Sequence, residues 1–166
     1  ADILNKLKGQ EEERAKNVVK NKLVDVVTAA SEVSVPSIFV ERELDSMINE
    51  LEQFLRMQGT NIERFLSYTG KKLADFREEK REEAKGRVKG NLVLAAIIEK
   101  EGIIATDEEL GERIRTFADS YKQDEQTVKD YFETPGRLDA LLQEIQYGKV
   151  IDFLVAEAKI SIETDR

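Results

Sequence analysis

Residues 73–100 decide the fold class, and they read LADFREEKREEAKGRVKGNLVLAAIIEK. The stretch contains no proline and carries apolar residues at helical spacing, so it predicts one long helix. A helix of about 28 residues is about 42 Å long, whereas a compact globule of this chain's length is about 40 Å across. Such a helix favours an elongated multi-helix body with protruding helical-hairpin arms over a sphere.

The two halves of this predicted helix differ in character. Residues 77–85 are mostly charged, which predicts a solvated helix face, with an electrostatic contact to a partner as the alternative. Residues 92–98 are apolar on nearly every face, so we expect them to be buried in the core. The apolar stripe of the first half is thin and consists of Leu73, Phe76, Ala84 and Val88.

Three further helical patterns precede this stretch, over about residues 11–30, 36–58 and 61–70. Their apolar residues recur at steps of three and four, as on one face of a helix. Pro36 suits the start of the second pattern, because its φ is already helical and it has no donor to leave unpaired. Asn61 can cap the third pattern.

Residues that favour the start or the end of a helix also occur after residue 100. Thr106 to Glu109 read TDEE, a capping box that opens a helix. Asp124 can cap a shorter helix, and Pro135–Gly136 marks a turn before a last helix that reaches about Lys159. Residues 160–162 predict a short extended tail. The patterns together predict an all-α chain of five to seven helices with essentially no sheet.

The composition narrows the classes of function. Residues 1–166, which we expect to form a single domain, hold 26 Lys and Arg against 34 Asp and Glu, with no His and no Cys. These absences exclude Cys/His zinc sites, thiol nucleophiles and Ser–His–Asp triads. The acidic excess disfavours nucleic acid as a partner, and no glycine-rich phosphate loop is present. We therefore expect no enzyme, no cofactor and no metal.

The distribution of apolar residues bears on location. No apolar run reaches about 18 residues, so we expect no membrane span. The first apolar residues are interleaved with charged ones, unlike a signal peptide. We therefore expect a cytoplasmic protein. The chain opens on Ala1 within a helical pattern, which looks like a fragment of a longer protein.

Four segments carry motifs in a fixed order. Residues 35–44 read VPSIFVEREL, residues 84–97 read AKGRVKGNLVLAAI, residues 101–110 read EGIIATDEEL and residues 149–160 read KVIDFLVAEAKI. They are similar to a V-P-x-x-x-x-x-x-E-[IL] opening, a central A-x-x-x-V-K-x-x-L-x-L-x-x-I helix, a junction before a capped helix and a closing K-V-x-d-F-L helix. In this order the chain, over about residues 11–162, resembles the C-terminal domain of bacterial trigger factor.

The resemblance implies an all-α body, related to the SurA core, whose two helical arms form a cradle for unfolded or nascent polypeptides. It implies an ATP-independent chaperone that prevents aggregation and assists folding. Neither the family's ribosome-docking loop, G-F-R-x-G-x-x-P, nor its FKBP-type isomerase domain is found in this sequence. We therefore expect ribosome contact only through a missing N-terminal domain, and no isomerase activity from this chain.

The first candidate site is a set of apolar side chains at the positions of the family's second arm, which contacts clients. Exposed apolar groups suit a promiscuous site, because apolar burial requires no specific partner geometry. Phe117 and Tyr121 are four residues apart and share a helix face. The alternative is that the set packs two short helices together. The set comprises Phe117, Tyr121, Val128, Tyr131 and Phe132.

The second candidate site lies at the end of the helix predicted over residues 36–58, in the family's first arm. It comprises Phe54, Leu55, Met57 and Phe65. The alternative is that these residues are buried inside the hairpin, since its helices must bury something against each other.

Two other functions compete with a polypeptide-binding chaperone. The same apolar patches could form a fixed interface in a helical scaffold or adaptor with one defined protein partner. A related alternative is a periplasmic chaperone core like that of SurA. An isolated domain with exposed apolar patches can also self-associate.

Overall fold

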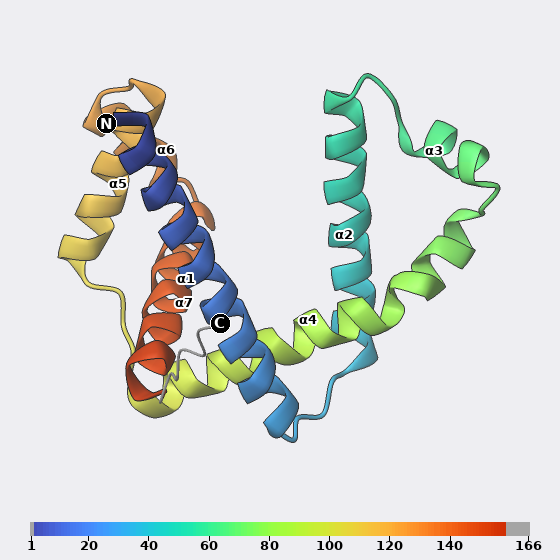
Figure 1. Ribbon diagram of the computed structural model, residues 1–166, viewed down its shortest axis with the longest axis horizontal. Coiled ribbons are helices and arrows are strands. Elements are labelled where there is room, and N and C mark those ends of the chain that lie inside the picture. The colour runs from blue at the N-terminus through green and yellow to red at the C-terminus, as the bar shows by residue number, and fades with distance from the viewer. Residues whose placement is uncertain (1, 159–166) are drawn as a thin grey trace. The chain divides into compact units, whose positions relative to one another are not determined.

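The structure of the protein is a computed structural model that describes residues 2–158, with the side chains of residues 9, 11 and 13–158. This part of the chain contains seven helices and no strand, which confirms the all-α prediction (Figure 1). None of the described helices combines the length and the apolar character that crossing a membrane requires. The helices are α1 (Asp2–Ala30), α2 (Ser37–Met57), α3 (Ile62–Thr69), α4 (Leu73–Glu101), α5 (Asp107–Tyr121), α6 (Glu125–Phe132) and α7 (Arg137–Glu157).

The contacts between residues divide the chain into two compact units. The α2–α3 unit comprises Val27–Val93 and so contains α2, α3 and most of α4. The α5–α7 unit comprises the described residues of Ala1–Val26 and Leu94–Arg166, which include most of α1, the end of α4 and all of α5, α6 and α7. The boundaries between the units therefore fall within α1 and α4.

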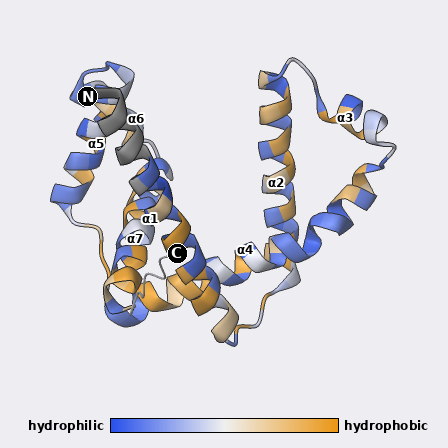
Figure 2. Cartoon of the chain, viewed as in Figure 1, coloured by the Kyte–Doolittle hydropathy of each residue, from blue (hydrophilic) through white to orange (hydrophobic). Residues whose placement is uncertain are grey.

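In the α2–α3 unit, α2 is an amphipathic helix that begins directly after Pro36, whose backbone is extended (φ −65°, ψ 135°). Hydrophobic and hydrophilic residues alternate along α2 (Figure 2). Its buried face presents Val40, Leu44 and Met47, which pack with Ala84 of α4. One face of α2 is thus covered by α4, as the apolar stripe predicts.

A second cluster forms at the other end of α2. Leu55 packs with Ile62 and Leu66 of α3, and all three are buried. The side chain of Asn61 accepts a hydrogen bond from the backbone N–H three residues later at 2.9 Å. Gly70 ends α3 in the left-handed conformation (φ 69°). The predicted cap of this short helix is therefore confirmed.

The charged first half of α4 pairs with α2. Arg77 donates to Glu41 at 2.8 Å and to Asp45 at 2.6 Å, and Arg81 donates to Glu41 at 2.5 Å. These hydrogen bonds, the one from Arg81 first, hold the pKa of Glu41 below its ordinary value of 4.5. The charged face of α4 therefore also connects two helices, in addition to facing solvent.

The apolar second half of α4 is buried on one side only. Val93 and Leu94 are 4% and 6% exposed, whereas Ala95 and Ala96 are exposed. The expectation that residues 92–98 are buried in the core therefore holds for Val93 and Leu94 and is wrong for Ala95 and Ala96. The uncovered side carries small alanine side chains, which leave little apolar area in water and so need no cover.

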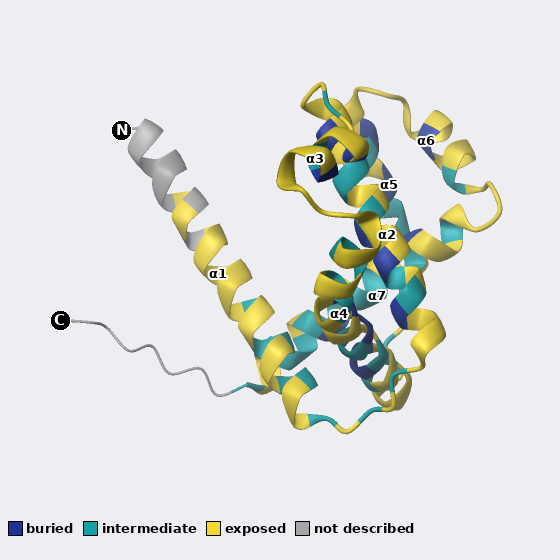
Figure 3. Ribbon diagram, turned by 90° about the vertical axis from the view of Figure 1, so that its right-hand side faces the viewer, coloured by how far each residue is buried: buried dark blue, intermediate teal, exposed yellow. Residues whose placement is uncertain are grey.

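Helix α1 begins earlier than the strong apolar pattern. It runs from Asp2 and continues through Gly9, whereas the strong apolar periodicity begins near residue 11 and Gly9 weakens the prediction of an extension over residues 1–10. A glycine inside a helix costs only about 1 kcal/mol relative to alanine. Most side chains of α1 that the structure describes are exposed (Figure 3), and Lys20 pairs with Asp152 of α7 at 2.7 Å.

In the α5–α7 unit, both predicted caps are confirmed. The Thr106 hydroxyl accepts from the Glu109 N–H at 3.3 Å, and the Glu109 carboxylate accepts from the Thr106 N–H at 2.8 Å. Asp124 accepts from the Thr127 N–H at 2.9 Å and so caps α6. Lys149 of α7 pairs with Glu109 at 2.8 Å, which connects the start of α5 to α7.

The core of the α5–α7 unit is apolar and is shared by three helices. Helices α5, α6 and α7 contact one another in pairs, and α7 follows the predicted turn, in which Gly136 has a φ of 82°. The tail expected at residues 160–162 lies outside the described residues. The buried core residues are Ile114, Ala118, Val128 and Leu141.

Candidate functional site

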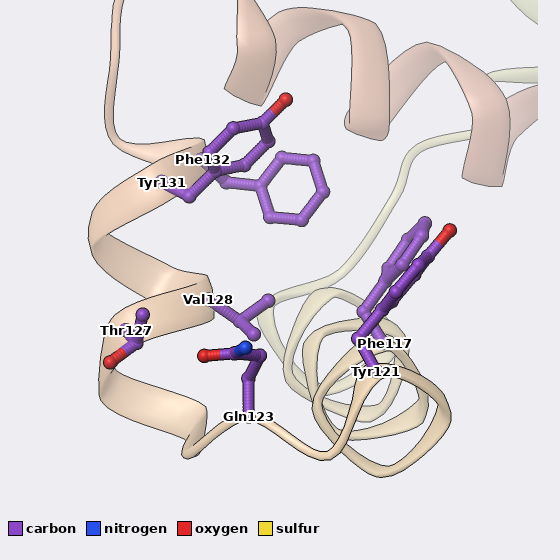
Figure 4. Close-up of a pocket in the computed structure, with 7 residues that line it drawn as sticks. All are labelled: Phe117, Tyr121, Gln123, Thr127, Val128, Tyr131 and Phe132. Carbon is purple, nitrogen blue, oxygen red and sulfur yellow. The ribbon is translucent and has the colours of Figure 1, made fainter.

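An open cleft of about 550 Å³ between α5 and α6 gathers all five residues of the first candidate set. The rings of α5 lie on one side of the cleft and the rings of α6 on the other (Figure 4). Whether the cleft binds a polypeptide stays a prediction. The aromatic cleft is defined by its lining residues, which are Phe117, Tyr121, Gln123, Thr127, Val128, Tyr131 and Phe132.

Helical spacing explains why these side chains converge. Phe117 and Tyr121 are four residues apart on α5 and therefore point from the same face. Val128, Tyr131 and Phe132 are three and four residues apart on α6 and share one face in the same way. The structure turns these two faces toward each other, as their joint lining of the cleft shows.

The chain reverses between α5 and α6 in a short turn. Lys122 ends α5 in the left-handed conformation (φ 52°, ψ 41°), the one non-glycine residue with positive φ in the described part of the chain. Sequence reasoning missed two residues of the aromatic cleft, Gln123 in this turn and Thr127 in the first turn of α6. Their polarity gave no signal, and their position beside a turn was the one available indication.

The four aromatic rings of the cleft form a continuous series of contacts, from Tyr121 through Phe117 and Phe132 to Tyr131. Phe117 stacks on Tyr121 with ring centroids 6.1 Å apart and an interplanar angle of 12°. Phe117 also lies 5.4 Å from Phe132, and Phe132 meets Tyr131 edge to face at 5.3 Å. Stacked and edge-to-face pairs are the favoured geometries of aromatic side chains, so each ring helps to stabilise the position of its neighbour.

Burial separates the base of the cleft from its rim. Val128 is 8% exposed and belongs to the core, and Phe117 and Phe132 are half-buried against that core. Tyr121 and Tyr131 are 70% and 54% exposed. A tyrosine suits such a rim, because its ring offers apolar contact while its hydroxyl stays in water.

Two arginines contact the rings. The guanidinium carbon of Arg113 lies 5.1 Å from the Phe117 ring centroid, and that of Arg137 lies 3.9 Å from the Tyr131 ring centroid. Both distances are within the range of a cation–π contact. Arg113 also pairs with Glu144 of α7. Each side of the cleft therefore has a guanidinium group against one of its rings.

The charged groups near the cleft serve local structure. The pKa of Asp124 is lowered by hydrogen bonds from Thr127, the one from its hydroxyl first and then the one from its backbone N–H. The carboxylate therefore stays ionised at neutral pH and complements the N-terminus of α6. Among the side chains that the structure describes, no group of three or more metal-ligating residues comes together.

The second candidate set does not converge. We call Phe54, Leu55, Met57 and Phe65 the α2-end patch. Phe54 and Met57 are 57% and 84% exposed, whereas Leu55 is 7% exposed and packs in the core. Phe65 is half-buried and meets Phe76 edge to face at 6.2 Å. Two residues of the patch face water and two pack inside.

A smaller cleft of about 300 Å³ lies beside the α2-end patch, between α2 and α4. Sequence reasoning missed it, because it assigned the charged residues of α4 to a solvated face. Its charges are paired: Glu83 accepts from Lys80 at 2.7 Å and from Arg87 at 3.1 Å. The lining residues are Met47, Glu50, Leu51, Phe54, Phe76, Lys80, Glu83 and Arg87.

Comparisons with known proteins give a consistent relationship. The family model described as bacterial trigger factor protein (TF) C-terminus matches residues 1–156. The trigger factor of Halothermothrix orenii is 42% identical over 93% of this chain and 36% of its own length. The trigger factors of Pelotomaculum thermopropionicum and Geobacillus kaustophilus are 38% and 31% identical, over 99% and 97% of the chain and 37% of their own lengths.

The alignments cover nearly all of this chain, but the chain spans little more than a third of the length of these relatives. A solved structure is also similar, one described as concerning domains of trigger factor from Thermotoga maritima. It matches over 87% of this chain and 83% of its own, with a TM-score of 0.65 and 23% identity. At that identity the match shows a common fold.

Proposed function

Because the chain belongs to the trigger factor family, as its C-terminal domain, we propose that it is an ATP-independent chaperone domain that binds unfolded or nascent polypeptides. The observation that carries the proposal is the aromatic cleft, an open hollow whose lining includes four rings. Two of those rings are more than half exposed. A protein that leaves such a hollow uncovered offers apolar contact to chains that have not yet buried their own apolar residues.

The energetics favour weak binding at several places along a client. Burying one phenylalanine or leucine contributes about 1.5–3 kcal/mol at best, and ordering the client subtracts from that. The aromatic cleft and the exposed part of the α2-end patch would act together on one polypeptide, which raises the overall affinity. Release needs no nucleotide, because each contact is weak and a client that folds withdraws its apolar residues.

The division of labour within the full-length protein is part of the proposal. This domain contributes client binding and no catalysis, and any ribosome attachment or prolyl isomerisation belongs to other parts of the longer protein. The same proposal places the protein in the cytoplasm, where nascent polypeptides are available. It treats the two compact units as one chaperone domain.

Binding to unrelated clients tests the function. Chemically unfolded proteins of unrelated sequence are titrated into the chain, and binding is measured by fluorescence anisotropy alongside suppression of their aggregation by light scattering. Dissociation constants on the order of micromolar for several clients support the proposal. Affinity for a single folded partner would favour the adaptor instead, and no binding at all would remove the chaperone function.

Serine substitutions test the cleft. Phe117, Tyr121 and Tyr131 are replaced together, and binding is compared with that of Tyr68→Ser, which alters a tyrosine outside the cleft that is 95% exposed. A loss of binding in the triple variant, with helix content retained in the far-ultraviolet spectrum, supports the cleft as the site. Binding equal to that of Tyr68→Ser would show that these rings do not bind clients and serve only to pack α5 and α6 together.

A further inference from the structure

We propose that Arg113 and Arg137 are positioning residues that hold the aromatic rings of the cleft in a binding-ready arrangement, so that the affinity for clients depends on two residues outside the cleft lining. This inference rests on the proposed function of the cleft. It concerns how the rings are kept in place and assigns neither arginine a contact with the client.

The α5 side of the cleft is a stack of three groups. Arg113, Phe117 and Tyr121 follow one another at intervals of four residues on α5, so the Phe117 ring lies between the other two. The guanidinium carbon is 5.1 Å from the Phe117 centroid, and the two ring centroids are 6.1 Å apart. Glu144 of α7 pairs with Arg113 and thereby anchors the stack to a second helix.

The α6 side is held by the first residue of α7. The guanidinium carbon of Arg137 lies 3.9 Å from the Tyr131 centroid, and its Nη1 donates to the Tyr131 carbonyl oxygen at 3.3 Å. One side chain thus holds both the ring and the backbone at the end of α6. Tyr131 in turn meets Phe132 edge to face at 5.3 Å.

Fixing these rings matters because the rim is exposed. Tyr121 and Tyr131 are 70% and 54% exposed, so core packing alone leaves their side chains free to change rotamer. A ring that is already fixed loses little conformational entropy when a client binds. The free energy of binding is then more favourable by the entropic cost that is avoided. The planar guanidinium suits this task, since it stacks on a ring while donating hydrogen bonds, whereas a lysine ammonium is a point charge that does not stack.

Charge-removing substitutions provide the main test. Arg113→Gln and Arg137→Gln are each expected to weaken binding of an unfolded client about fivefold, the scale of one cation–π contact. The matched control is Arg115→Gln, the same change on α5 at an exposed arginine whose Nε donates to the Gly111 carbonyl oxygen of its own helix. Binding by both variants that equals the control would overturn the inference.

A double-mutant cycle separates positioning from direct contact. If Arg137 acts through Tyr131, then Arg137→Gln adds little to the loss already caused by Tyr131→Ser. An undiminished loss in that background would mean that Arg137 touches the client, which would overturn the inference. Arg137→Lys keeps the charge without the planar fork, so it is expected to restore less than half of the lost affinity, and a full restoration would argue against stacking.

A spectroscopic signature tests the ring arrangement without a client. The chain has no tryptophan and four tyrosines, so its near-ultraviolet circular dichroism reports tyrosine and phenylalanine packing alone. We expect Arg113→Gln and Arg137→Gln to reduce this signal while the far-ultraviolet signal and the melting temperature match those of Arg115→Gln. If the unaltered chain bound no client, the proposed function would fail, and the near-ultraviolet signal would still decide whether the arginines order the rings.

Discussion

The aromatic cleft and the α2-end patch both contain aromatic and aliphatic side chains, yet only those of the aromatic cleft converge on one hollow. In the aromatic cleft, each contributing helix presents its residues at intervals of three or four, and the two faces meet around one hollow. In the α2-end patch, Leu55 packs with Ile62 and Leu66 of α3. Leu55 is buried while Phe54 and Met57 stand in water. What a neighbouring helix places against each face, more than spacing or composition, separates a convergent surface from a dispersed one.

The two units also differ in what connects their helices. The α2–α3 unit combines two small apolar clusters with a row of ion pairs between α2 and α4. The α5–α7 unit relies on one apolar core shared by three helices, and the aromatic cleft opens directly above that core. Exposed ion pairs contribute little to stability, so the apolar clusters carry most of it in both units.

The largest expected effect comes from the cores. Leu44→Ala and Leu141→Ala each remove a side chain that is at most 2% exposed and should lower the free energy of unfolding by about 2–5 kcal/mol. Leu141 shares its cluster with Val128, so Leu141→Ala should also weaken client binding. Denaturant titrations measure the loss of stability, and binding assays measure the loss of client affinity. Equal loss of affinity in the two variants would contradict the expectation that client binding depends more on the α5–α7 unit.

The next effect compares the two exposed surfaces directly. Tyr121→Ser with Tyr131→Ser should weaken client binding about tenfold, whereas Phe54→Ser with Met57→Ser should weaken it about threefold, because dispersed residues share less of one client segment. All four side chains are more than half exposed, so melting temperatures should change little. Anisotropy titrations with one client measure both, and the opposite order would make the α2-end patch the principal site.

Helix caps give a smaller and more local comparison. Asn61→Ala in the α2–α3 unit and Asp124→Ala in the α5–α7 unit each remove a side-chain acceptor at a helix N-terminus. Each should cost about 1 kcal/mol of stability. Asp124→Ala should also reduce client binding, since α6 carries half of the aromatic cleft, and an equal reduction by Asn61→Ala would show that general destabilisation is the cause.

The smallest effect is the response to acid. Arg81 and then Arg77 hold the pKa of Glu41 below its ordinary value of 4.5, so the folded state releases this proton more readily than the unfolded state. The resulting stabilisation is present above about pH 4.5 and disappears as the pH falls through the lower, folded-state pKa. Glu41→Gln should therefore reduce the difference in unfolding free energy between pH 7 and acid.

The control for the acid response is Glu63→Gln, which alters a glutamate on α3 with no ion pair in the described part of the chain. Unfolding followed by circular dichroism between pH 7 and pH 3 provides the measurement. Glu109→Gln offers the counterpart in the α5–α7 unit, where the hydrogen bond from Lys149 is the first cause of a lowered pKa. An unchanged acid response in Glu41→Gln would show that its ion pairs with α4 leave stability unaffected.

The sequence by itself determined that the chain is all-α and where several of its helices are capped. Three helix caps form through hydrogen bonds to backbone groups three residues away, those of Asn61, Thr106 and Asp124. Because both partners are close in sequence, the local sequence is enough to predict these helix starts. The same holds for Gly70 and Gly136, whose positive φ values suit the one residue without a Cβ atom. The family motifs, which lie in order along the chain, were likewise readable without coordinates.

Only the tertiary structure decided which apolar side chains are covered. Val128 and Leu55 carry the same kind of signal as Tyr121 and Met57, yet the first two are buried and the last two are exposed. Ala95 and Ala96 lie in an apolar run and face water all the same. Burial depends on what a distant segment places against a helix face, and periodicity states which residues share a face without stating what covers it.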